Sequence, residues 1–173
     1  MKVLVGFATA AGSTEGVAQR IAGIVRENGH EVETHNVDEV TDLHGYEAFI
    51  IGSAVHNQAW LPNAAAFLSR ENPALSGKPV WLFSIGLPGA LRGPMRKWAG
   101  LEESDILAGL ADDVRPLGHE LFTGVVTPQA FGKVGARVFR LMGGRFGDFR
   151  DWAAIDAWAN QIAEDLTDTE TLG

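Results

Sequence analysis

The sequence predicts an α/β fold in which a parallel β-sheet carries helices on both of its faces. Three short runs are apolar throughout, namely KVLVGF (2–7), AFIIGSA (48–54) and PVWLFSIG (79–86), which is typical of strands buried on both sides. The segments between them include stretches whose apolar residues recur at helical spacing. Apolar strands that alternate with helices favour a parallel sheet over an antiparallel one.

The elements follow one another from the N-terminus. Residues 13–28 are predicted to be helical, because their apolar residues lie on one helical face and Asn28-Gly29 is a stop signal. Residues 31–37 alternate as an edge strand does. The remaining predicted elements are a helix opened by proline at 62–70, a helix at 102–113, a strand at 119–126 and a C-terminal helix with Trp152, Ile155, Trp158, Ile162 and Leu166 on one face.

Length and composition indicate a single domain spanning residues 1–173. The chain is 46% hydrophobic and 21% charged, as ordinary globular proteins are. Its net charge of −8 disfavours nucleic-acid binding, which requires a basic surface. The absence of cysteine fits a reducing cytoplasm, and no apolar run approaches the roughly 18 residues of a membrane span. We therefore expect a cytoplasmic protein, and no metal site is predicted.

The segment FATAAGSTEG (7–16) follows the first predicted strand and opens the first predicted helix. It places the hydroxyls of Thr9, Ser13 and Thr14 around Gly12, with Ala10 and Ala11 between them. Ligands of parallel sheets bind at the carboxyl ends of the strands, where a helix N-terminus offers free N–H groups and a positive dipole end. The segment predicts a phosphate-binding loop at 9–14. The alternative is that Ser13 or Thr14 merely caps the helix.

Competing phosphate motifs are absent from the sequence. No G-x-G-x-x-G follows the first strand and no G-x-x-x-x-G-K-[ST] occurs, which disfavours a dinucleotide site and a P-loop. GSTEG (12–16) also differs from the G-x-S-x-G of hydrolases.

The motif TAAGST (9–14) resembles the T-x-T-G-x-T loop with which flavodoxins bind the phosphate of FMN, although Ala11 replaces the middle threonine. Two further segments, IIGSAVHNQAWLPNAAAFL (50–68) and FGKVGARVFRLMGGRFGDFRDW (131–152), resemble the flavodoxin-like menaquinone-dependent protoporphyrinogen oxidases. The resemblance covers essentially the whole chain. It implies a flavodoxin-like doubly wound sheet of five parallel strands in the order 2-1-3-4-5, with non-covalently bound FMN.

The same resemblance implies that the flavin ring lies at the ends of two apolar strands. The expected contacts are Ser53, Ala54, His56, Asn57 and Trp60 after one strand, and Gly86, Leu87 and Gly89 after the next. Structural alternatives stay open: His56 as an exposed turn residue, Trp60 packed under the helix from Pro62, and 86–89 as a plain chain reversal. No catalytic side chain stands out.

Two insertions, at about 86–101 and 128–150, exceed a minimal five-strand unit, and such insertions are usually functional or mobile. The first holds a basic group beside an aromatic residue: Arg92, Arg96, Lys97 and Trp98. In the second, Phe131, Val134, Val138 and Leu141 form a stripe at helical spacing among basic residues. Most such stripes are core, but a basic amphipathic helix also contacts anionic membranes or an acidic substrate such as a porphyrin.

These observations predict a flavin-dependent oxidoreductase, and the resemblance pairs protoporphyrinogen as donor with a quinone as acceptor. Residues 131–150 would make any peripheral contact with a membrane. The alternative is a soluble flavodoxin-type electron carrier, whose acidic N-terminal half can steer a basic redox partner. The same fold also suits a deazaflavin, which shares the phosphate and the tricyclic ring. The sequence does not predict the oligomeric state.

Overall fold

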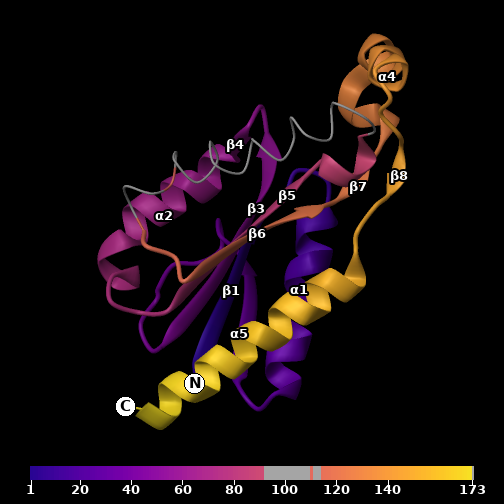
Figure 1. Cartoon of the computed structure of the whole chain (residues 1–173). Coiled ribbons are helices and arrows are strands. Elements are labelled where there is room, and N and C mark those ends of the chain that lie inside the picture. Colours follow the sequence, from indigo (N-terminus) through magenta and orange to yellow (C-terminus); the bar gives the residue numbers. More distant parts are fainter. Residues whose placement is uncertain (92–109, 111–113, 173) are drawn as a thin grey trace.

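The central sheet consists of parallel strands in the order β2-β1-β3-β5-β6. The computed structural model describes residues 1–91, 110 and 114–172 (Figure 1). A short strand β4 forms an antiparallel hairpin with β3. Counted along the parallel strands alone, the order is 2-1-3-4-5, so the predicted fold class is confirmed. The strands are β1 (Lys2–Ala8), β2 (Glu31–Asn36), β3 (Ala48–His56), β4 (Ala59–Trp60), β5 (Val80–Gly86) and β6 (Gly118–Thr123).

Helices cover both faces of this sheet (Figure 1). On one face α1 (Ser13–Glu27) packs beside α5 (Trp152–Leu172), and α2 (Pro62–Leu75) lies on the other. Successive residues of a strand point to opposite faces. Val3 and Val5 therefore join the core beneath α1 and α5, whereas Leu4 joins the core beneath α2. Both faces of β1, β3 and β5 are buried, which explains why the sequences of these three strands are apolar throughout.

Several elements differ from the sequence prediction. Helix α2 continues past Arg70 to Leu75, because the buried Leu75 anchors its last turn to the core. The predicted strand 119–126 is interrupted at Gly124: β6 ends at Thr123, and β7 (Val125–Val126) pairs instead with β8 (Gly147–Asp148). A short 3₁₀ helix, η1 (Pro88–Ala90), follows β5. The predicted helix at 102–113 lies outside the described residues except for Leu110, as do Arg92, Arg96, Lys97 and Trp98.

The 128–150 insertion contains a 3₁₀ helix η2 (Pro128–Phe131) and α4 (Gly132–Leu141), which projects from one end of the molecule (Figure 1). No residue of α4 is buried, so the core alternative for the apolar stripe is wrong. The helix is held instead through Phe139, whose ring centroid lies 4.5 Å from that of Phe131 and 5.3 Å from that of Phe146. Among the described helices, none combines the length and hydropathy needed to cross a membrane. The expected cytoplasmic location stays a prediction.

Strand β3 requires glycine at position 52, because the fully buried ring of Phe83 on β5 occupies the space above it. A Cβ there would overlap three ring atoms. We expect Gly52→Ala to lower the free energy of unfolding by about 1–3 kcal/mol, the usual cost of overpacking. Urea unfolding followed by circular dichroism measures the change. Gly23→Ala, with nothing within 4 Å of the new methyl group, is the control and should stabilise α1 by about 0.5–1 kcal/mol. Equal stability of Gly52→Ala and the unaltered chain would contradict this packing.

A polar cluster at the amino end of β1 makes stability depend on pH. The Lys2 ammonium lies 2.8 Å from Glu33 Oε1, and the Tyr46 hydroxyl donates to Glu33 Oε2. The hydrogen bonds from Lys2 and then Tyr46 lower the pKa of Glu33 from 4.5 to about 2. A carboxyl with a lowered pKa stabilises the folded state above pH 4.5, and this contribution disappears as the pH falls toward about 2.

We therefore expect Glu33→Gln to flatten the acid side of the stability profile over that pH interval. The effect should be small, because the Glu33 side chain is 39% exposed and solvent screens the pair. Urea unfolding at a series of pH values checks it, with the exposed Glu39→Gln as the control. If the free energy of unfolding falls as steeply with decreasing pH for Glu33→Gln as for the control, folding does not stabilise this carboxylate.

Candidate functional site

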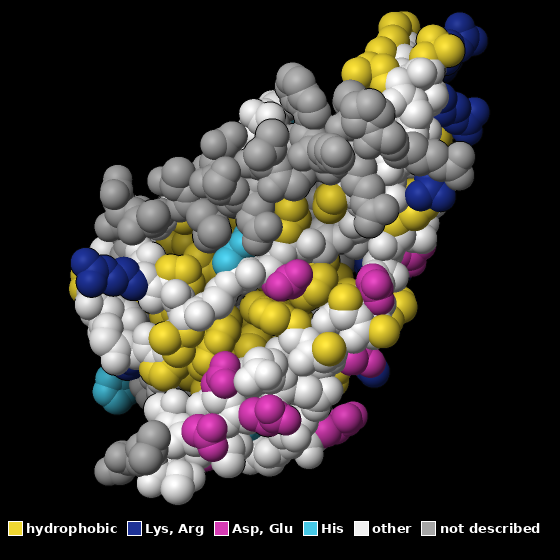
Figure 2. Space-filling model, in the orientation of Figure 1, with side chains coloured by type: hydrophobic (Ala, Val, Ile, Leu, Met, Phe, Trp, Pro, Cys, Tyr) yellow, Lys and Arg dark blue, Asp and Glu magenta, His cyan; other side chains and the backbone are white. Residues whose placement is uncertain are grey.

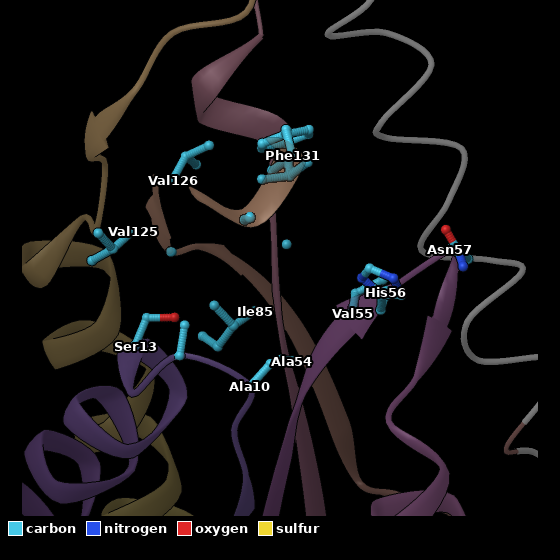
Figure 3. Close-up of a pocket in the computed structure, with 15 residues that line it drawn as sticks. Ala10, Ser13, Ala54, Val55, His56, Asn57, Ile85, Val125, Val126 and Phe131 are labelled. Atoms are coloured by element: carbon cyan, nitrogen blue, oxygen red, sulfur yellow. The ribbon is translucent and has the colours of Figure 1, made fainter. Parts of the chain in front are cut away.

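A pocket of about 350 Å³ opens at the carboxyl-terminal edge of the sheet (Figure 3). Such a volume is in the range of cofactor and ligand sites. In Figure 3 Ser13 and Asn57 lie at opposite ends of the pocket, with Phe131 above and Ile85 below. Four segments line it: the loop after β1 (Ala10, Ala11, Ser13), the end of β3 (Ala54, Val55, His56, Asn57), the end of β5 (Ile85, Gly86, Leu87) and the chain after β6 (Gly124, Val125, Val126, Ala130, Phe131).

The loop after β1 leaves the start of α1 open to an anion. Gly12 has φ +85°, a left-handed conformation that favours glycine, and its N–H donates to Thr9 Oγ1 at 2.8 Å. Among the described residues, no side chain caps the first turn of α1. Ser13 and Thr14 lie inside the helix, so the alternative that either one caps it is wrong. The first N–H groups and the positive end of the helix dipole are therefore available to bind an anion.

Thr14 adds a second polar group without a partner among the described residues at this helix start. Its side chain is fully buried, and its hydroxyl has no hydrogen-bond partner among the described residues. An unpaired buried hydroxyl costs about 1–3 kcal/mol, so it is seldom retained without a compensating contact. The chemistry of this donor set, a hydroxyl beside the free N–H groups of a helix start, suits a phosphate group, which accepts from both kinds of donor.

The β3–β4 hairpin forms the other end of the pocket. Its two turn residues, Asn57 and Gln58, both have positive φ, of 51° and 63°, as a tight two-residue hairpin turn requires. Val55 pairs with Trp60, and His56 pairs with Ala59. The hairpin thereby presents the exposed His56 and Asn57 at the pocket wall (Figure 3). His56 is the one histidine of this wall, and it offers a nitrogen donor or acceptor to a bound ring.

Trp60 and Ser53 are predicted flavin contacts, but neither of them lines this pocket. Trp60 is 5% exposed, and its indole Nε1 donates to Ser84 Oγ at 2.7 Å. It belongs to the core beneath α2, so the packing alternative describes it, and stacking on a ring would require it to leave that core. The Ser53 hydroxyl is engaged in the backbone, since it donates to the Ala54 carbonyl at 2.8 Å and accepts from the Leu61 N–H at 3.1 Å.

Some of the other predicted site residues line the pocket, and the rest lie near it without lining it. Gly89 shapes the loop after β5 by donating its N–H to Thr123 Oγ1 at 2.9 Å, and it does not line the pocket. Thr9 and Gly12 lie in the loop after β1 and Thr14 lies in the first turn of α1, and none of the three lines the pocket wall. The residues that the structure does gather at the wall are Ala10, Ala11, Ser13, Ala54, His56, Asn57, Gly86 and Leu87. Their role in holding a cofactor stays a prediction.

The apolar part of the pocket wall is not predicted from the sequence. The sequence predicts one continuous strand through Gly124, Val125 and Val126, although the rule that ligands bind at the carboxyl ends of strands applies to β6 as well. Phe131 was assigned to the apolar stripe of the following helix. The other missed lining residues are Val55, Ile85 and Ala130.

Basic groups of the last insertion lie beside the loop and the pocket wall. The Arg145 guanidinium donates to the Gly89 carbonyl at 3.0 Å, which ties the insertion to the loop after β5. Arg150 binds Asp148, with Nε 2.9 Å from Oδ1, and this hydrogen bond holds the pKa of the Asp148 carboxyl below its usual value. The Arg150 Nη1 lies 2.9 Å from the position of a Cβ on Gly16, so a positive group faces the first turns of α1. Among the described residues, no group of side chains could hold a metal ion.

Comparison with known proteins gives the same fold. The sequence model of the flavodoxin domain family matches residues 4–136. A short-chain flavodoxin associated with a non-canonical PDU bacterial microcompartment is 14% identical, with a TM-score of 0.62 over 98% of each chain. A variant of the flavodoxin from Pseudomonas aeruginosa is 15% identical, with a TM-score of 0.55 over 96% of this chain and 99% of that one.

Larger proteins contain a similar domain. The rubredoxin oxygen:oxidoreductase from Desulfovibrio gigas is 19% identical, with a TM-score of 0.61. The match covers 96% of this chain and 36% of that one, so this chain spans about a third of its length. At such identities, the likeness of the structures establishes the fold alone.

Proposed function

Because the chain belongs to the flavodoxin domain family, we propose that its pocket holds FMN, with the phosphate at residues 9–14. The observation that carries the proposal is the buried, unpartnered hydroxyl of Thr14 at the uncapped start of α1. When bound, FMN supplies one- and two-electron redox chemistry. The loop binds the phosphate through hydroxyl and N–H donors.

The pocket suits a flat ring that is largely apolar and polar at its edge. Ile85, Val126 and Phe131 supply apolar surface that excludes water from the ring. His56 and Asn57 supply hydrogen-bonding groups at the hairpin end. A deazaflavin would meet the same residues. The absorption spectrum and mass of the ligand released by heating distinguish the two cofactors.

The finer proposal is an oxidoreductase similar to menaquinone-dependent protoporphyrinogen oxidases, with a quinone as electron acceptor. The 128–150 insertion supports it. Phe131 and Ala130 of this insertion line the pocket wall, and the adjoining α4 is exposed and basic. A substrate that carries carboxylates, such as a porphyrinogen, or a lipid quinone would be approached from that side.

A soluble electron carrier fits the family equally well. Its specific support is the excess of exposed acidic side chains in the N-terminal half, which would attract a basic redox partner. These residues are Glu27, Glu31, Asp38, Glu39, Asp42 and Glu47.

One pair of assays separates the two functions. The FMN-loaded protein is mixed with protoporphyrinogen and a menaquinone analogue, and porphyrin formation is followed by fluorescence. Saturable turnover is expected for the oxidase. The carrier instead shows no turnover with this pair but exchanges electrons with a basic redox protein, more slowly as salt screens charges beyond about 10 Å at 0.1 M. A protein that retains no flavin would contradict both functions.

A further inference from the structure

The exposed apolar residues of the described chain are concentrated on α4 and the residue after it. Val134, Val138 and Leu141 are 77%, 48% and 87% exposed, and Met142 is 51% exposed. Val134, Val138 and Leu141 are spaced i, i+4 and i+7, which places them on one face of the helix. Together with Met142 they form what we call the α4 apolar stripe. The other large hydrophobic side chains exposed among the described residues, Leu117 and Trp152, lie on separate segments.

A row of basic residues runs along the same helix. Lys133, Arg137 and Arg140 have the same i, i+4, i+7 spacing, and each directly precedes a residue of the apolar stripe. Because one residue corresponds to a rotation of about 100° on a helix, the two rows are parallel neighbours. All three are exposed, and none of them forms an ion pair with another described residue. Figure 2 shows hydrophobic and basic side chains together at this end of the molecule.

The side of α4 that packs on the rest of the protein differs from the side that carries the apolar stripe. Phe139 stacks on Phe131 and also lies against Phe146, with ring centroids 4.5 Å and 5.3 Å apart. Arg140 of the basic row reaches the edge of this side, where its guanidinium lies 5.2 Å from the ring centroid of Phe146. These aromatic contacts fix the helix on its base and leave the apolar stripe without a partner in the described chain. The aromatic contacts on one side of α4 therefore keep the apolar stripe exposed on the other side.

We propose that α4 docks on an anionic phospholipid surface, with the apolar stripe inserted among the acyl chains and the basic row at the level of the headgroups. This arrangement is typical of short interfacial helices. The chain carries a net charge of −8, so an anionic surface would repel it elsewhere, and α4 offers a local basic area of the opposite sign. A second copy of the chain is a poorer occupant, because pairing two stripes would bring two basic rows together.

Docking would also orient the pocket. Ala130 and Phe131 line the pocket, and α4 begins at the next residue, Gly132. The pocket wall would therefore lie close to the lipid surface, within reach of a lipid-soluble electron acceptor. This consequence rests on the proposed function, whereas docking does not require FMN.

Vesicle flotation of the full-length protein tests docking. The probes are vesicles of phosphatidylcholine and vesicles in which about a third of the lipid is phosphatidylglycerol. We expect binding to the anionic vesicles at about 0.1 M salt, at least about fivefold weaker binding to the neutral ones, and loss of binding near 1 M salt, where the screening length falls to about 3 Å. No binding to anionic vesicles at low salt would overturn the proposal.

Two pairs of variants separate insertion from other contacts. Val134→Ser with Leu141→Ser, and Lys133→Gln with Arg137→Gln, should each weaken vesicle binding about fivefold or more while thermal stability is kept, since all four side chains are exposed. Leu117→Ser and Arg115→Gln change exposed residues outside α4 and should leave binding unchanged. If the serine pair binds as well as the unaltered chain, the contact is only electrostatic and lipid insertion is wrong. Flavin titration of the same variants is a separate readout, so a protein that binds vesicles but not FMN would contradict only the proposed function.

Discussion

Replacing Thr14 with valine is expected to weaken FMN binding by about 1–3 kcal/mol, which corresponds to roughly 5- to 150-fold in the dissociation constant. Valine has nearly the shape of threonine but lacks the hydroxyl that the phosphate would engage. The side chain is fully buried, so water cannot replace the lost donor. Titration of the apo-protein with FMN, followed by flavin fluorescence, measures the change.

The same substitution should stabilise the protein without FMN, although it weakens FMN binding. The Thr14 hydroxyl has no partner among the described residues, and removing an unpaired buried polar group relieves a cost. We expect the apo-protein to gain about 1 kcal/mol in the free energy of unfolding. Thr14→Ser, which keeps the hydroxyl, is the control and should retain most of the affinity. An unchanged FMN dissociation constant for Thr14→Val would exclude this hydroxyl from the phosphate site.

Filling the pocket should weaken flavin binding strongly without unfolding the protein. Ala54 lines the pocket at the end of β3, and Figure 3 shows it beside Ile85 and Ala10. In Ala54→Phe the phenyl ring would occupy the space intended for the cofactor. We expect the affinity for FMN to fall by about 3 kcal/mol, or roughly 100-fold, because bound FMN would then overpack the site.

Ala59→Phe is a matched control for this prediction. Ala59 lies on β4 in the same hairpin, is exposed and does not line the pocket. Its phenyl ring should leave FMN affinity unchanged. If Ala54→Phe binds FMN as tightly as Ala59→Phe, the cofactor does not enter this pocket.

The fold could be predicted because its strongest signals are local. Buried parallel strands such as 48–54 are apolar on both faces, and helices such as 13–28 show one apolar face and a clear stop at Asn28-Gly29. The loop at 9–14 could be located for the same reason, since its hydroxyl residues lie within one short segment. Its role in binding phosphate stays a prediction. The end of α2 was missed because the buried Leu75, a tertiary contact, carries the helix beyond Arg70.

The pocket wall could not be predicted fully from the sequence, because tertiary contacts decide which residues line it. Trp60 follows His56 closely in sequence, yet its hydrogen bond to Ser84 and its place under α2 remove it from the pocket. The α4 stripe has the spacing of a core helix, and only its position at the end of the molecule shows that nothing in the described chain covers it. Periodicity indicates which residues share a face, but not what that face meets.

The most direct test compares FMN with riboflavin, which lacks only the phosphate. If residues 9–14 hold that phosphate, FMN should bind the apo-protein at least about tenfold more tightly, since a charge-assisted hydrogen bond contributes about 1.5–3 kcal/mol. Isothermal titration at one salt concentration gives both dissociation constants, and the difference should shrink in Thr14→Val. Equal affinities for FMN and riboflavin in the unaltered chain would contradict a phosphate site at the start of α1.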